Sequence, residues 1–280
     1  MRPLLGAHVS AAGGYDEALK RGEAMGAEVI QVFVSSPRSW RVIQPDKEKI
    51  DKYQEIKSKS SVKKVYAHGC YLANLGTPQK DLLEKSARSL REEFRVVTTM
   101  GFEGLIFHVG SVNGQESLPV KQIAKAIKDA LKAAPGKSQI IMENAASDSK
   151  IGAKFEDFTE IMKAVDSSRL KICYDTAHGF EAGLIGNYVP KEIDRLLKYI
   201  NKTVGLKNLV ALHINDSKTV FNSKNDRHEN IGKGYIGLNG FKNLAKEKRL
   251  AHTAWMLEVP GFDNQGPDKK NLDILKSCFK

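Results

Sequence analysis

The sequence predicts an α/β fold, a single (β/α)8 TIM barrel that spans residues 1–280. Three observations support this prediction. Eight short apolar or β-branched runs recur along the chain, and stretches with helical spacing of apolar residues lie between them. Eight strand and helix units match the number that closes such a barrel. The composition, 41% hydrophobic, supplies a full core and argues against disorder.

The predicted strands are short and nearly continuous in apolar residues, which is typical of parallel strands buried on both faces. We place them at residues 4–9, 29–34, 65–68, 104–109, 139–143, 170–175, 209–213 and 255–258.

The predicted helices show one apolar stripe each. The clearest stripe has gaps of 4, 3, 4 and 3 residues, at Leu83, Ala87, Leu90, Phe94 and Val97. Thr77-Pro78 before this stretch and Gly101 after it predict its start and its end. Similar stripes occur in 155–165 and 193–200. A doubly wound open sheet is the alternative fold, but residues 8–14 lack the G-x-G-x-x-G turn expected after its first strand.

Charge and cysteine content limit the functions to consider. The 44 Lys and Arg against 33 Asp and Glu give a net charge of +11, which favours a polyanionic partner such as DNA or RNA. Cys70, Cys173 and Cys278 show no C-x-x-C spacing, so neither a disulfide framework nor a cysteine zinc site is expected. No signal-peptide pattern and no apolar run of about 18 residues occurs. We therefore expect a cytoplasmic protein with no membrane partner.

Polar residues follow the predicted strands at their C-terminal ends, where TIM barrels place their active sites. They are His8, His68, His108, Glu143, Asp175, His178, His213 and Glu258, with Asp226-x-His228 in the loop after the seventh strand. One such histidine alone is more often a core residue. If several strands converge, however, their carboxylates come close together and repel one another unless cations bind between them. Imidazole and carboxylate ligands without cysteine favour zinc or a similar divalent ion. The number of candidates predicts more than one metal ion at the C-terminal ends of the strands.

Several short segments, taken together and in order, carry a resemblance to a known family. They lie at residues 6–14, 37–40, 71–76, 107–111, 175–178, 213–218, 226–228, 232–237 and 257–258. With these segments the sequence resembles endonuclease IV, the zinc-dependent apurinic/apyrimidinic endonucleases of base-excision repair, nearly from end to end.

The resemblance implies three zinc ions per chain. The first would be held by His68, His108 and Glu143, the second by Glu143 as a bridge with Asp175, His213 and Glu258, and the third by His178, Asp226 and His228. It further implies hydrolysis of the phosphodiester 5′ to an abasic site in duplex DNA by a hydroxide between the first two ions, while the third ion stabilises the departing 3′ oxygen. The products would be a 3′-hydroxyl and a 5′-deoxyribose phosphate, with removal of 3′-blocking groups as a further activity. Glu143 and Glu258 are the implied catalytic residues, and Glu258 would help to orient the nucleophile.

The resemblance also implies a DNA interface. Arg38, Tyr71 and Leu72 match family positions that enter the duplex at the lesion, where a missing base makes insertion less costly. From the residues alone, Tyr71-Leu72 would be an ordinary packing pair. Four basic residues near Asp226-x-His228 are candidates for phosphate contacts, and a solvated basic loop is the alternative; they are Lys218, Lys224, Arg227 and Lys233.

Some residues depart from the family pattern without removing a metal ligand. They are Ser35-Ser36 for Lys-Asn, Cys70 for Ser, residues 145–147 as Ala-Ala-Ser for Thr-Ala-Gly, Ala177 for Cys and Val259 for Thr. They bear on lesion preference and on trimming of 3′ ends more than on phosphodiester hydrolysis.

Two other functions stay open from the sequence. A metal-dependent sugar isomerase or epimerase of the xylose-isomerase-like barrels would use Glu143, Asp175, His213 and Glu258, but it leaves the remaining histidines and the +11 charge unexplained. A DNA-binding barrel that has lost its chemistry conflicts with the complete ligand set. The resemblance suggests a monomer.

Overall fold

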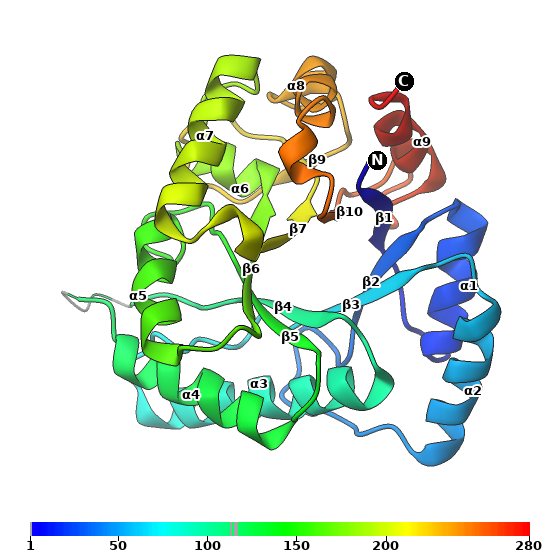
Figure 1. Cartoon of the computed structure of the whole chain (residues 1–280), viewed down its shortest axis with the longest axis vertical. Helices are drawn as coiled ribbons and strands as arrows, with labels where there is room; N and C mark the ends of the chain where they lie inside the picture. The colour runs from blue at the N-terminus through cyan, green and yellow to red at the C-terminus, as the bar shows by residue number, and fades with distance from the viewer. Residues whose placement is uncertain (1, 113, 115–116) are drawn as a thin grey trace.

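The computed structural model describes residues 2–112, 114 and 117–280 and contains a closed barrel of parallel strands (Figure 1). The strand order around the barrel is β1-β10-β7-β6-β5-β4-β3-β2, so pairing of β1 with β10 closes it. The strands are β1 (Leu4–His8), β2 (Val29–Phe33), β3 (Lys64–His68), β4 (Gly104–His108), β5 (Gln139–Glu143), β6 (Leu170–Asp175), β7 (Leu209–His213) and β10 (Ala254–Leu257). The predicted TIM barrel is confirmed, and each predicted strand is present to within one residue at either end.

Helices surround the barrel and alternate with its strands (Figure 1). They are α1 (Tyr15–Met25), α2 (Lys47–Lys59), α3 (Lys80–Met100), α4 (Val120–Ala133), α5 (Phe155–Val165), α6 (Thr176–Glu181), α7 (Pro190–Thr203), α8 (Gly237–Ala245) and α9 (Lys269–Ser277). Helix α3 ends at Gly101 as predicted, because this residue adopts a left-handed φ of 71° and its N–H bonds to Thr98. It begins at Lys80, two residues after the predicted Thr77-Pro78 start. No helix among the described residues is long and apolar enough to cross a membrane.

The barrel has an apolar layer inside it, separate from the larger core between strands and helices. This inner layer consists of Val29, Tyr66, Ile106, Ile141, Cys173, Ala211, Ala254 and Met256. Side chains of a strand alternate between its two faces, so the residue two positions further on points to the same interior. Those residues are Gln31, His68, His108, Glu143, Asp175, His213 and Glu258. A polar layer therefore lies directly above the apolar layer, at the C-terminal ends of the strands.

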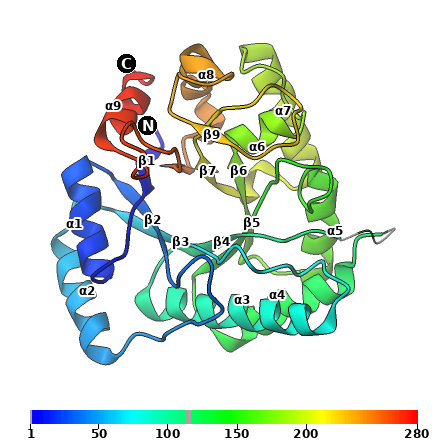
Figure 2. The same cartoon turned by 180° about the vertical axis from the view of Figure 1, so that it is seen from behind.

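A small antiparallel hairpin follows β7 and lies near α6 at the same end of the barrel (Figure 2). It pairs β8 (Asp216–Ser217) with β9 (His228–Glu229). The buried Asp216 carboxylate accepts hydrogen bonds from the backbone N–H groups of Gly232, Gly234 and Ile236, at 2.9, 3.0 and 2.9 Å. This carboxylate holds the segment after β9, and the hairpin brings His228 to the polar layer of the barrel.

Candidate metal centre

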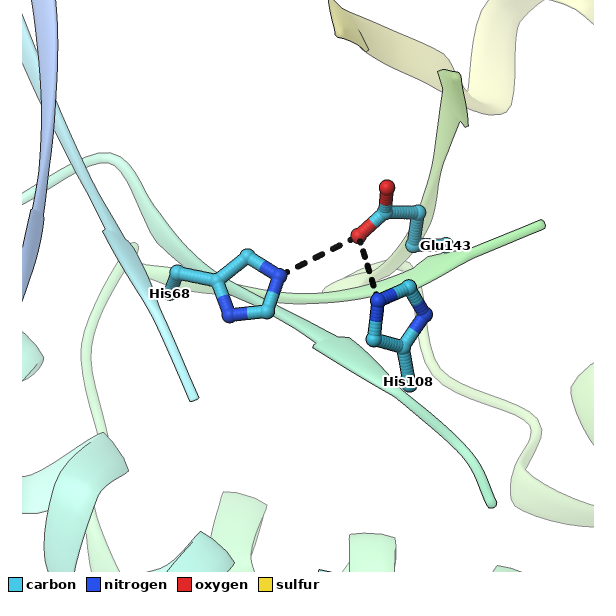
Figure 3. Close-up of side chains that lie close together, drawn as sticks. All are labelled: His68, His108 and Glu143. Atoms are coloured by element: carbon cyan, nitrogen blue, oxygen red, sulfur yellow. Dashed lines mark hydrogen bonds and ion pairs between the residues drawn. The ribbon is translucent and has the colours of Figure 1, made fainter. Parts of the chain in front are cut away.

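The polar layer contains three groups of imidazole and carboxylate atoms, with the atoms of each group within 4.8 Å of one another. In the first group, Nε2 of His68 lies 3.2 Å and Nε2 of His108 lies 3.6 Å from the same oxygen, Oε2 of Glu143. Figure 3 shows both imidazole rings turned toward this carboxylate. The three residues come from the ends of β3, β4 and β5, so the barrel itself sets their arrangement.

The second group uses the other oxygen of Glu143. Oε1 of Glu143 lies 2.8 Å from Nδ1 of His213, which is also 3.1 Å from Oε2 of Glu258 and 4.0 Å from Oδ2 of Asp175. Glu143 thus offers one oxygen to each of two adjacent groups, as a bridging carboxylate must.

The third group contains Asp175, His178 and His228. Asp226 joins it from the loop before β9, because its Oδ1 lies 3.3 Å from Nε2 of His178 and 3.5 Å from Nε2 of His228. Asp175 also faces this group, with Oδ2 at 3.8 Å from Nε2 of His228. The structure therefore brings all nine predicted ligand positions together, and it places Asp175 between the second and third groups.

The chemistry of these donors fits divalent metal ions. Glu143 and Asp175 are completely buried, and among the described residues no lysine or arginine forms an ion pair with them or with Glu258. Histidines compensate these carboxylates instead, and buried like charges at such distances need bound cations or protons. Imidazole nitrogen with carboxylate oxygen, without a thiolate, is a ligand set that suits zinc.

The site shifts the pKa values of the predicted ligands in different directions. Burial alone would raise the pKa of the Glu143 carboxyl, but the charge of His213 outweighs it and holds that pKa well below its usual range. For Glu258 the same burial is outweighed chiefly by His213, and its pKa is also lowered. Burial lowers the pKa of His108 to about 4, so this imidazole is neutral at pH 7. Burial alone would also lower the pKa of His178 and His213, but the surrounding charges raise both well above the usual value, so metal binding there would displace a proton from each ring.

A cavity of about 540 Å³ opens over the metal groups. Its lining includes His68, His108, His178, Asp226, His228 and Glu258, together with Tyr71, Lys224 and Arg227. Six of the nine ligand positions are therefore reachable from one opening, and the remaining three lie beneath them in the buried layer.

The residues predicted to enter DNA lie beside this cavity. Tyr71 and Leu72 are 57% and 36% exposed, so neither is an ordinary core residue, and Arg38 is exposed on a neighbouring loop. The Tyr71 ring packs edge-on against His68 at a centroid distance of 5.5 Å. Its backbone N–H donates to the carbonyl of Pro37 at 2.9 Å, which ties the two loops together.

The four predicted phosphate contacts are not equivalent. Lys224 and Arg227 line the cavity, whereas Lys218 and Lys233 lie outside its lining. The Nζ atom of Lys224 pairs with Asp148 at 2.8 Å and donates to the carbonyl of Ala182, so this lysine already bridges two loops over the site.

Three buried amides that the sequence analysis left without a role contact the ligands. Asn144 accepts from the Asp175 backbone N–H at 2.6 Å, and Asn215 donates to Oδ2 of Asp175 at 2.6 Å. Gln31 contacts both His213 and Glu258. A polar amide inside or directly after an apolar strand is the signal that could have identified them.

Glu93 of α3 connects the two loops that carry the predicted DNA-entering residues. Its buried carboxyl accepts a hydrogen bond from Oγ of Ser35 at 2.8 Å and another from the Cys70 backbone N–H at 3.1 Å. Burial raises the pKa of Glu93 to about 7, against the lowering effect of these two hydrogen bonds.

Fold and site together define a class of protein, a TIM barrel whose C-terminal face gathers groups of side chains that could hold metal ions. The model of the xylose isomerase-like TIM barrel family matches residues 19–278. A probable endonuclease 4 from Aquifex aeolicus is 35% identical over 280 residues, covering 99% of this chain and 98% of that protein. The structure of endonuclease IV from Thermus thermophilus matches with a TM-score of 0.86 and 29% identity, covering 99% of this chain and 98% of that one. The chain belongs to the endonuclease IV family, as its residues predicted.

Sugar-converting relatives share the architecture. A D-tagatose 3-epimerase-like protein matches with a TM-score of 0.69 at 17% identity, covering 98% of this chain and 96% of that one. This likeness concerns the fold alone.

The buried Glu93 carboxyl generates a prediction about stability and pH. The pKa of Glu93 is raised in the folded state, so its stabilising contribution is complete below about pH 4.5 and is lost as the pH rises through about 7. Gln at this position keeps an oxygen that accepts from Ser35 and Cys70 and cannot ionise. We expect Glu93→Gln to gain about 3 kcal/mol of unfolding free energy relative to the wild type between pH 5 and pH 8.

Urea unfolding of the zinc-loaded proteins across this pH range measures the difference. Glu84→Gln, which removes an exposed carboxylate of the same helix, controls for the loss of one charge. Parallel stability curves for Glu93→Gln and the wild type would contradict the prediction.

Proposed function

We propose that this chain is a zinc-dependent endonuclease that hydrolyses the phosphodiester 5′ to abasic sites in duplex DNA, leaving a 3′-hydroxyl and a 5′-deoxyribose phosphate. The observation that carries the proposal is the arrangement of eight residues in three adjoining groups, with Glu143 shared by two of them and Asp226 beside the third as a ninth residue. Sites with two or more metal ions suit displacement at phosphorus, because attacking and leaving oxygens both need charge stabilisation. Removal of 3′-blocking groups would use the same site.

The residues of the chain have separable roles in this reaction. The first zinc would be held by His68, His108 and Glu143, the second by Glu143, Asp175, His213 and Glu258, and the third by His178, Asp226 and His228. Zinc bound there supplies Lewis-acid stabilisation of phosphate oxygens and lowers the pKa of water. Glu143 fixes the spacing of the first two groups, because each of its oxygens faces one of them. Glu258 lines the cavity with one carboxylate oxygen near His213, where it can orient the attacking nucleophile.

The DNA interface follows from exposure and charge. Tyr71 and Leu72 project from the end of β3, three and four residues after the ligand His68, so insertion at a lesion would place the adjacent phosphate near the metal groups. Arg38 would enter from the neighbouring loop. Phosphates would be contacted by Lys224 and Arg227 at the cavity and by Lys218 and Lys233 further out. The net charge of +11 supports binding of a polyanion.

The alternative function is a metal-dependent sugar isomerase or epimerase. The specific observation in its favour is that Glu143, Asp175, His213 and Glu258 form a complete group by themselves. That reaction needs one or two ions and gives no role to the third group at His178, Asp226 and His228.

We propose further that the endonuclease acts as a monomer in the cytoplasm.

Incision of a defined duplex tests the proposed function. A labelled duplex with one tetrahydrofuran abasic analogue cannot undergo β-elimination, so its cleavage requires hydrolysis. We expect a product that ends in a 3′-hydroxyl directly 5′ to the analogue. Glu143→Ala removes an oxygen from two groups at once, and we expect it to reduce incision by at least about 10³-fold, or about 4 kcal/mol, while binding to abasic DNA stays measurable.

Two outcomes would count against these roles. Near-normal incision by Glu143→Ala would contradict the bridging assignment. Absence of cleavage by fully zinc-loaded wild type would favour the isomerase, and sugar substrates would be tested next.

Metal content separates the two functions directly. We expect about three zinc ions per wild-type chain, measured by mass spectrometry of metals after extensive gel filtration. The double variant Asp226→Ala and His228→Ala removes two donors of the third group, and we expect it to retain about two ions. A single ion in the wild type would contradict the nuclease proposal.

Lesion selection depends on the exposed pair at the end of β3. We expect the double variant Tyr71→Ala and Leu72→Ala to lose about tenfold or more of its preference for abasic over intact duplex, because stacking on a base is worth about 1 to 3 kcal/mol. Binding titrations of both duplexes at one salt concentration measure the ratio. Val189→Ala, which shortens an exposed apolar side chain at the start of α7, is the control. Unchanged discrimination would refute the insertion role.

A further inference from the structure

Gln31 is a polar residue in the middle of an otherwise apolar strand. It lies in β2, where Val29, Ile30 and Val32 are buried, and its own side chain is completely buried inside the barrel. It shares the register of His8 on β1 and of Tyr66 on β3. A buried amide is costly unless its polar atoms are paired, so its partners show what it does.

All polar atoms of the Gln31 side chain point at the metal groups. Oε1 lies 2.9 Å from Nε2 of His213, while Nε2 lies 2.5 Å from Oε1 of Glu258 and 3.0 Å from Nδ1 of His8. Chemistry fixes this orientation of the amide. An ionised carboxylate only accepts hydrogen bonds, so the NH₂ group faces Glu258 and the carbonyl oxygen faces His213.

This orientation determines the tautomer of His213. The carbonyl oxygen of Gln31 only accepts, so Nε2 of His213 carries the proton that it donates. Nδ1 is then the nitrogen left for a metal ion: it lies 2.8 Å from Oε1 of Glu143 and 3.1 Å from Oε2 of Glu258, where a bound zinc ion would take the place of the proton that it donates to these carboxylates. A histidine ligand whose other nitrogen is held by a hydrogen bond has a fixed ring and a fixed ligand atom.

The same amide fixes the carboxylate of Glu258. Oε1 of Glu258 accepts a hydrogen bond from Gln31, so Oε2 of Glu258 remains on the side of His213. Two of the four donors of the second group are therefore oriented by one side chain from a strand that supplies no ligand of its own.

We propose that Gln31 is a positioning residue that selects the Nδ1 ligand atom of His213 and the Oε2 ligand atom of Glu258, and thereby sets the zinc affinity of the second group. The inference rests on the proposed metal centre and goes beyond it, since it concerns a residue outside the ligand set. It does not depend on the DNA reaction.

Zinc affinity of two variants tests the inference. Gln31→Met has a similar length and no hydrogen bonds, and Gln31→Glu keeps the shape but turns an oxygen toward Glu258. Competition with a chromophoric chelator at pH 7.5 measures each zinc dissociation constant. We expect one ion of the set to bind about 10- to 100-fold more weakly in Gln31→Met, and at least as weakly in Gln31→Glu, while the other ions keep their wild-type affinity.

The matched control is Gln122→Met. Gln122 also uses its amide inside the protein, where Nε2 donates to the carbonyls of Leu75 and Thr77, at 2.8 and 3.0 Å. It contacts no metal ligand, so we expect unchanged affinity for every ion. This control separates the loss of two hydrogen bonds from a partly buried amide from the loss of ligand orientation.

Nitrogen NMR of the zinc-loaded proteins gives an independent readout. We expect wild-type His213 to show a proton on Nε2 that is protected from solvent exchange, and that protection to be lost in Gln31→Met. Wild-type affinity for every ion in both Gln31 variants, with the His213 signals unchanged, would overturn the inference. Failure of the wild type to incise DNA would instead overturn the proposed function, because neither zinc affinity nor the tautomer depends on incision.

Discussion

The structure around the barrel mouth is organised by one constraint, the repulsion among buried carboxylates. Glu143 and Asp175 are completely buried, and Glu258 points into the same volume from the end of β10. Their charges are compensated by imidazoles alone among the described residues, with no lysine or arginine in contact. Bound cations reduce the repulsion among buried carboxylates, so metal binding is expected to stabilise the folded form of this layer.

The barrel interior separates an apolar layer from the polar layer that contains these carboxylates. Ile141 and Cys173 belong to the apolar layer, while Glu143 and Asp175, each two residues further along the same strand, belong to the polar one. The polar layer is held in turn by amides. Asn215 donates to Asp175 and accepts from the Glu258 backbone N–H at 2.8 Å, so two ligands share one support. Ligand geometry therefore depends on a connected hydrogen-bond network, and altering one amide affects more than one ligand.

The sequence predicts the strands well, and it predicts candidate ligands at their ends, because both depend on local pattern. Apolar runs of parallel strands are nearly continuous, and a His, Asp or Glu at the end of each run stands out. What the pattern does not contain is which atoms face one another across the barrel. Asp175 also faces the third group because it caps α6, accepting from the His178 backbone N–H at 2.9 Å. The roles of Gln31 and Glu93 likewise depend on residues more than 50 positions away, such as His213 for Gln31 and Ser35 for Glu93.

In the proposed function, the same strand ends would connect the selection of a lesion with the chemistry at the metal centre. His68 is a predicted ligand and Tyr71 is exposed three residues later, with their rings 5.5 Å apart. Behind them, Glu93 holds the loop after β2 to the loop after β3 through Ser35 and Cys70. A side chain inserted into the duplex from these loops would thereby be held near the metal groups. Such a rigid connection lets binding at the gap in the base stack position the neighbouring phosphate for hydrolysis, because orientation of the reacting groups supplies much of a catalytic effect.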